Sequence, residues 1–145
     1  MTSVTGHPKN RLYINSGASL HILFNKELLG KLKDVEDPIK IQAGGKPFHI
    51  KQIGSLHQAL RYLLLPVSAY HYSGTAIANL LSFAKLADEY YIICNTRVDD
   101  AIYVQSKDDG KYLRFQRDPK HNLYYMDISK AEVDEHCDIN TVKDR

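Results

Sequence analysis

A short polar turn contains the residues whose types could position a reactive group. The apolar run Leu12–Ile14 ends at Asn15, Ser16 and Gly17, and an apolar segment resumes at residues 20–24. A glycine beside small polar residues leaves the backbone bare enough for a ligand to approach closely. The turn therefore predicts a site that holds one polar side chain, that of Asn15, at a fixed point.

Motifs for several other reactions are missing from the sequence. There is no glycine-rich phosphate loop, no Gly-x-Ser-x-Gly elbow, and no histidine pair spaced i, i+4 beside a glutamate. Cys94 and Cys137 lie far apart and do not have metal-ligand spacing. We interpret them as reduced thiols, with a single disulfide as the alternative. We therefore expect no metal and no cofactor.

The composition is that of an ordinary globular domain. The 145 residues are 43% hydrophobic and 25% charged, with a formal net charge of +2. That charge is too small to predict a nucleic-acid partner, and no apolar run is long enough to cross a membrane. We expect a cytoplasmic protein with no membrane partner. Residues 1–10 are expected to be a flexible leader, and residues 129–145 a weakly ordered polar tail.

The first part of the chain has the pattern of two strands joined by the polar turn. Residues 11–15 and 20–24 are rich in strand-forming apolar residues. Residues 25–30 favour a short helical turn that a glycine ends, and residues 31–37 are polar enough to predict a loop.

A hairpin is predicted around the adjacent glycines Gly44 and Gly45. Apolar and polar residues alternate on both sides, in 39–42 and in 47–53. A plain surface hairpin explains this pattern. The alternative is a mobile flap that closes over a bound peptide.

The remaining segments are mostly β in pattern. Residues 57–65 fit either a strand or a helix, and 67–75 suggest a strand and a loop. Residues 76–82 predict a buried strand that leads into a short helix at 83–89. Turn-forming clusters then separate four segments that predict an antiparallel meander, namely 90–94, 101–105, 111–116 and 122–127.

Three of these features, in this order, resemble the retropepsin-like aspartic proteases, and within them the proteases of Copia-type retrotransposon polyproteins. Residues 12–21 resemble the apolar strand and Asp-Ser/Thr-Gly-Ala turn of that family. Residues 41–46 resemble its flap, and 78–86 resemble its apolar strand that leads into a helix. Residues 122–127 resemble the segment on the C-terminal side of the protease in Copia-type polyproteins. The resemblance covers roughly residues 11–127.

The resemblance implies a fold and a domain organisation. The fold would be mainly β, a closed barrel with a flap hairpin, a short helix and an extra C-terminal β-meander. The protease domain would span residues 11–128, with a core at 11–89 and a C-terminal β extension at 90–128. Whether this extension widens a dimer interface, covers the subunit or belongs to the next part of a polyprotein is left open.

The resemblance also implies a mechanism and a partner. Each subunit of such a protease supplies one Asp, and the paired carboxylates share a proton because two adjacent like charges do not both ionise easily. One carboxylate activates a water, while the other protonates the scissile carbonyl. Because the sequence has a single such turn, the protein would be a homodimer. Its substrate would be a polyprotein, inside retroelement particles.

The same resemblance implies roles for individual positions. The position of Asn15 would be catalytic, with Gly17 beside it in the turn, and the Ser16 hydroxyl would brace two turns across the dimer axis. The substrate-binding positions would lie in the turn, at the flap tip and in the strand before the helix: Ala18, Gly44, Gly45, Leu80 and Leu81.

The sequence departs from the family at the position of the catalytic Asp. Residue 15 is Asn, and a carboxamide has no useful basicity and cannot hold the shared proton. We therefore predict a protease scaffold that does not hydrolyse peptides, whether the substitution is deliberate or natural. Ser82 also stands where retroviral members have Gly, and Phe83 replaces the Arg of an ion pair found near their active site. The alternatives are a non-enzymatic retroelement-derived domain that binds a peptide or partner, and a β-rich structural module.

Overall fold

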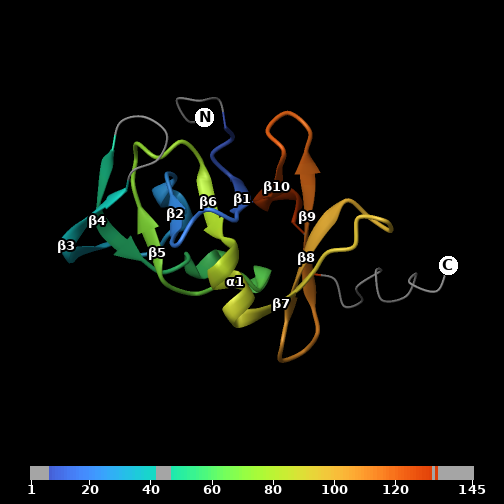
Figure 1. Ribbon diagram of the computed structural model, residues 1–145. Helices are drawn as coiled ribbons and strands as arrows, with labels where there is room; N and C mark the ends of the chain where they lie inside the picture. Colours follow the sequence, from blue (N-terminus) through green and yellow to red (C-terminus); the bar gives the residue numbers. More distant parts are fainter. Residues whose placement is uncertain (1–6, 42–46, 132, 134–145) are drawn as a thin grey trace.

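The computed structural model of the chain describes residues 7–41, 47–131 and 133 (Figure 1). The predicted flap-tip glycines Gly44 and Gly45 lie outside the described residues. The described strands are β1 (Arg11–Asn15), β2 (His21–Leu23), β3 (Lys33–Ile41), β4 (Phe48–Gly54), β5 (Tyr70–Tyr72), β6 (Asn79–Ser82), β7 (Tyr90–Ile93), β8 (Ala101–Ser106), β9 (Tyr112–Asp118) and β10 (Leu123–Asp127). The helical elements are α1 (Phe83–Glu89) and the short 3₁₀ helices η1 (Lys26–Leu28), η2 (Gln58–Leu63) and η3 (Ile128–Lys130).

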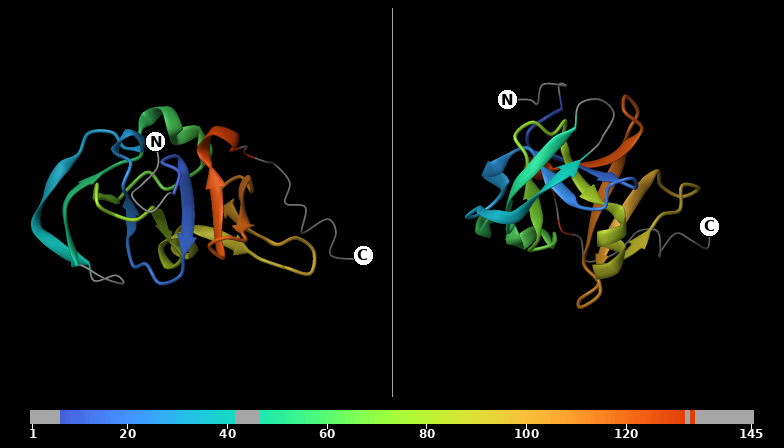
Figure 2. Two further views of the ribbon diagram at one scale, coloured as in Figure 1. Left: turned by 90° about the horizontal axis from the view of Figure 1, so that it is seen from above. Right: turned by 60° about the vertical axis from the view of Figure 1, so that its left-hand side comes forward.

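The fold is mainly β, as predicted, but the described strands form one open mixed sheet instead of a closed barrel. Their order is β3-β4-β5-β2-β6-β1-β10-β9-β8-β7, so β3 and β7 are free edges in the described part of the chain. Figures 1 and 2 show β3 at an outer side of the molecule, whereas Figure 1 shows β7 beside α1. The predicted antiparallel meander is confirmed. Its last strand, β10, pairs with β1, which extends the sheet sideways instead of closing it.

The predicted helix at 83–89 is confirmed, because local signals define it. Ser82 is its N-cap, and the Ser82 Oγ accepts a hydrogen bond from the Lys85 N–H at 3.2 Å. The loop predicted at 31–37 is wrong, since β3 begins at Lys33 and pairs with β4. This strand lies at the sheet edge, where exposed charged residues are tolerated and the usual alternation is lost.

Residues 7–10 pack against the sheet, in contrast to the flexible leader expected at 1–10. The His7 side chain is buried, and its Nδ1 lies 2.9 Å from the Tyr13 hydroxyl. The backbone carbonyl of Asn10 accepts a hydrogen bond from the Ile128 N–H at 3.0 Å. Residues 1–6 lie outside the described part. None of the described helices has the length and apolar character needed to cross a membrane.

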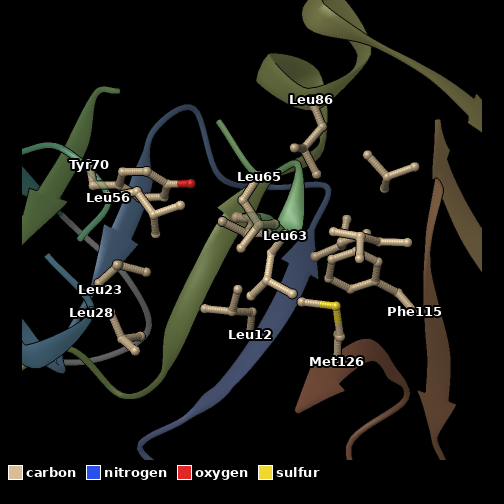
Figure 3. Close-up of a cluster of buried hydrophobic side chains, with 14 of the residues drawn as sticks. Leu12, Leu23, Leu28, Leu56, Leu63, Leu65, Tyr70, Leu86, Phe115 and Met126 are labelled. Carbon is tan, nitrogen blue, oxygen red and sulfur yellow. The ribbon is translucent and has the colours of Figure 1, made fainter. Parts of the chain in front are cut away.

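Residues 11–89 and 90–128, which were predicted to be a core and a separate extension, share one hydrophobic core. Leu12 and Leu86 belong to the predicted core segment, and Phe115 and Met126 to the predicted extension, yet all four lie in one buried cluster (Figure 3). Ala131 and Val133, in the predicted polar tail, pack against the same cluster. The meander is therefore part of the domain's own core. This burial favours folding of the whole described region as one unit.

Strand β1 lies in the middle of this arrangement. It pairs in parallel with β6, from Leu12↔Asn79 to Asn15↔Ser82, and antiparallel with β10. Backbone hydrogen bonds thus hold β1 on both sides. The strand that ends at Asn15 is therefore fixed by segments from both halves of the chain.

The side chain of Asn79 is fully buried at the crossing of β1, β2 and β6. Its Oδ1 accepts hydrogen bonds from the backbone N–H groups of Phe24 at 2.9 Å and Asn25 at 3.3 Å. Its Nδ2 donates to the backbone carbonyls of Lys9 at 2.7 Å and Arg11 at 3.1 Å. Each of the amide atoms is satisfied, which is what a buried polar group requires.

Substitution of Asn79 by Ala is expected to destabilise the domain by at least about 3 kcal/mol, because it leaves several buried backbone groups without partners. Urea unfolding followed by circular dichroism would measure this as a lower midpoint. Asn95→Ala is the matched control, since the Asn95 bond to the Arg97 N–H is exposed. It is expected to cost less than about 1 kcal/mol. Equal midpoints for Asn79→Ala and the parent protein would contradict the role given to Asn79.

Candidate functional site

The turn after β1 is closed by its own side chain. The Gly17 N–H donates a hydrogen bond to Asn15 Oδ1 at 2.8 Å, and the Ala18 N–H donates to the Asn15 carbonyl at 3.4 Å. Ser16 and Gly17 are exposed, while Asn15 and Ala18 are partly buried. An Asn side chain that accepts from the residue two positions on is typical of a turn.

Two buried side chains fix this turn from below. The Ser82 hydroxyl donates to the Ala18 carbonyl at 2.8 Å, and the Ser82 N–H donates to His21 Nδ1 at 3.0 Å. Ser82 and His21 are almost entirely buried. The contacts connect the turn to β2, β6 and the first turn of α1. The backbone around Asn15 is therefore held in place by a fixed hydrogen-bond network.

His21 must be neutral to take part in this network. Its Nδ1 accepts the Ser82 hydrogen bond, so the ring proton resides on Nε2. Burial is the main cause that lowers the pKa of His21 to about 4, and the nearby charges of Lys85 and His71 act in the same direction. At neutral pH the imidazole is a hydrogen-bond acceptor in the core and carries no charge.

His71 is a second buried imidazole on the adjacent strand β5. It pairs with Ile22 of β2, and its Nδ1 has no hydrogen-bond partner among the described residues. Burial, followed by the charge of Lys85, lowers the pKa of His71. The sheet behind the turn therefore contains two histidines for which protonation is unfavourable.

A cleft of about 450 Å³ opens beside the turn. Its lining is mostly apolar, and Lys40 is its only charged side chain among the described residues. Lys40 has no ion-pair partner in the described part of the chain. The lining residues are Asn15, Gly17, Ala18, Ser19, Leu20, Ile22, Lys40, Ile41, Phe48, Thr75, Ala76, Ile77 and Leu80.

The structure brings most of the described predicted site residues to this cleft. Asn15, Gly17, Ala18 and Leu80 line it. The predicted flap-tip glycines Gly44 and Gly45 lie outside the described residues. The flanking parts of the hairpin do border the cleft, because a residue at the end of β3 and another at the start of β4 line it.

Leu81 does not have the place that the sequence predicted for it. It is completely buried in the main core, whereas its neighbour Leu80 is partly exposed and lines the cleft. Successive residues of a strand point to opposite faces, so adjacent leucines do not both reach the same cleft. Ser16 is exposed and is not one of the residues that line the cleft.

The sequence reasoning missed several residues that shape the site. Ser82 was noted only as a departure from the family, although a serine directly before a helix is a typical N-cap signal. No local sequence pattern places His21 beneath the turn or Lys40 in the lining of the cleft. Ile77, a large apolar side chain that is 53% exposed, also lines the cleft.

The described side chains that line this cleft are apolar or neutral polar groups, apart from Lys40. The Asn15 carboxamide can donate and accept hydrogen bonds, but it cannot take a proton from water at neutral pH. No Asp or Glu side chain is among the described lining residues. Within the described ranges there is no group of three or more His, Cys, Asp or Glu side chains that could hold a metal ion.

Comparison with known proteins adds no family assignment to this geometry. Searches against models of protein families, against curated proteins and against solved structures found no match.

The network around His21 predicts a dependence of stability on pH. The folded chain holds His21 with a pKa of about 4, against an ordinary value of 6.5. Between these values the unfolded chain binds more protons, so the free energy of unfolding falls as the pH is lowered from about 6.5 to 4, by about 3 kcal/mol from His21 alone.

The variant His21→Asn keeps an acceptor near the position of Nδ1 but does not titrate. Urea unfolding at a series of pH values is expected to show a weaker decline in stability for this variant than for the parent protein. His49→Asn, at an exposed position on β4, is the control and is expected to keep the parent's profile. An unchanged pH profile in His21→Asn would contradict this role of His21.

Proposed function

We propose that the chain is a subunit of a retropepsin-like aspartic protease of the Copia type in which Asn15 occupies the catalytic position. It binds extended segments of a polyprotein in the cleft beside the turn, and it does not cleave them. One observation carries this proposal. The turn, Ile41 and Leu80 come from the three parts of the sequence that resemble the family, and they line one cleft.

The cleft has the chemical character needed to bind a peptide. Its apolar side chains would accept apolar side chains of the bound segment, with a gain of roughly 25 cal/mol for each Å² of apolar surface buried. Gly17 is exposed and Ala18 is partly buried, and both line the cleft, so the main chain of a bound peptide would lie against them. Lys40 favours an acidic group on the bound segment, because it has no counter-ion in the described part of the chain.

Loss of activity follows from the chemistry of residue 15. In the proposed homodimer, two Asn15 side chains would meet where two carboxylates share a proton in an active enzyme. An amide pair can hydrogen-bond to a peptide carbonyl, but it cannot act as the general base that activates water. Binding and dimerisation would remain, because Asn and Asp have nearly the same shape.

A second candidate is a non-enzymatic, retroelement-derived domain that binds a peptide or a protein partner. It is favoured by the absence of carboxylates among the described residues that line the cleft. The two candidates differ in what the scaffold can do once a carboxylate is supplied. Only a protease scaffold would then hydrolyse a peptide bond.

The variant Asn15→Asp is expected to cleave a polyprotein fragment, because it restores the group that can act as general base and acid. The expected gain over the parent protein is about 10³-fold, the usual size of a general acid–base contribution. Activity should lie between about pH 4 and 7, where one carboxylate of such a pair is protonated. Electrophoresis and mass spectrometry of the products would measure it.

The control for this experiment is Asn95→Asp, which makes the same chemical change in a turn away from the cleft. Asn95 accepts a hydrogen bond from the Arg97 N–H at 3.2 Å, so it holds a turn of the same kind. This variant is expected to remain inactive. If Asn15→Asp fails to cleave at every pH in that range, the protease proposal is wrong and the non-enzymatic candidate is retained.

The proposed dimer predicts that the chain self-associates through the exposed turn. Sedimentation velocity at micromolar concentrations is expected to show a dimer. Ser16→Glu would place two like charges near the axis and weaken the dimer by about tenfold or more. Ser129→Glu, also at an exposed serine, is the matched control and should leave the dimer unchanged. A strict monomer, or equal effects of the two variants, would contradict this arrangement.

A further inference from the structure

The turn that lacks a carboxylate has the chemical features needed to generate one. Asn15 is followed by the small residues Ser16 and Gly17, and both of these are exposed. We propose that Asn15 is a site of spontaneous deamidation in the folded protein, which converts its carboxamide into a carboxylate. The modification stands on the geometry of the turn alone. Its consequence, a restored catalytic group, rests on the proposed function.

The hydrogen bond inside the turn prepares the carboxamide for this reaction. The Gly17 N–H donates to Asn15 Oδ1 at 2.8 Å, which folds the side chain back toward the peptide that follows it. The same bond polarises the Asn15 side-chain carbonyl and would stabilise negative charge on its oxygen during attack. The Asn15 Nδ2 makes no hydrogen bond with any residue in the described part, so nothing there holds the leaving group.

The reaction balances with water as its only co-reactant. The backbone nitrogen of Ser16 loses its proton to solvent base and attacks the Asn15 Cγ, and the Cγ–Nδ2 bond breaks to release ammonia. The product is a five-membered succinimide. Water then opens the ring. Opening at Cγ gives aspartate at position 15, and opening at the backbone carbonyl gives isoaspartate, whose main chain contains one extra carbon.

The chain carries an internal comparison for this chemistry. Asn95 forms the same kind of turn, because its Oδ1 accepts from the Arg97 N–H at 3.2 Å. It precedes Thr96, whose branched side chain crowds the attacking nitrogen more than the side chain of Ser16 does. Asn79 is the asparagine protected from deamidation in this comparison, since it is fully buried and hydrogen-bonded through both amide atoms.

The test is to incubate the purified full chain at mildly alkaline pH and to map its peptides by mass spectrometry. Dilute protein is used, because the proposed dimer would bring two turns together. Deamidation at Asn15 is expected to be about tenfold faster than at Asn95, a ratio that corresponds to about 1.4 kcal/mol of activation free energy. Asn79 is expected to keep its amide.

Two variants test the role of the Ser16 nitrogen. Ser16→Thr gives Asn15 the same following residue as Asn95 and is expected to slow the reaction at Asn15 to the rate seen at Asn95. Ser16→Pro removes the N–H and should abolish the reaction, and the second position of a turn accepts proline well. The urea midpoint of each variant verifies that it is folded. An Asn15 rate no higher than that of Asn95, or an unchanged rate in both variants, would overturn the proposal.

A cleavage assay separates this inference from the proposed function. The aged parent protein is compared with Asn15→Asp on the same polyprotein fragment, and its activity should rise with the fraction of aspartate at position 15. If position 15 deamidates but the aged protein and Asn15→Asp are both inactive, deamidation is supported and the proposed function fails. If Asn15 keeps its amide while Asn15→Asp cleaves, the inference fails and the proposed function is supported.

Discussion

The buried carboxamide of Asn79, on β6, takes part in four hydrogen bonds, two as donor and two as acceptor. They connect β6 to Lys9 just before β1 and Arg11 at its start, and to Phe24 and Asn25 just after β2. A fully buried amide is stable only when its donors and acceptors are paired, so these segments must come together in one arrangement. That arrangement lays β6 parallel to β1 and brings Ser82 next to Asn15. The position of the site is therefore a consequence of how this one side chain is satisfied.

Local patterns predicted the elements that neighbouring residues determine. The helix that begins at Phe83 has a serine N-cap, and the meander has turn-forming clusters between its strands. The resemblance implied a closed barrel, whereas the described strands form an open sheet, because closure depends on which distant strands become neighbours. In this structure β6 pairs with one side of β1, and β10 pairs with the other. The start of β3 was missed for a different reason, since an edge strand of charged residues has the same composition as a loop.

The residues that line the candidate site could be predicted better than the buried residues that hold them in place. The turn at Asn15 and the nearby Leu80 could be identified from their own segments, and both line the cleft. The burial of Leu81 depends on which face β6 turns toward the core, which its own sequence does not reveal. The bond between His21 and Ser82 joins residues 61 positions apart, so no local pattern could indicate it.

The two edges left free among the described strands differ in their capacity to accept another strand. The β3 edge carries exposed charges and Pro38, and its register shifts between Asp34 and Ile39, which are features that block pairing. The β7 edge, Tyr90–Ile93, has no charged residue and no proline. Two chains joined along β7 would leave only charged β3 edges outside. Lateral growth of this sheet would therefore end at a pair and would not continue into a ribbon.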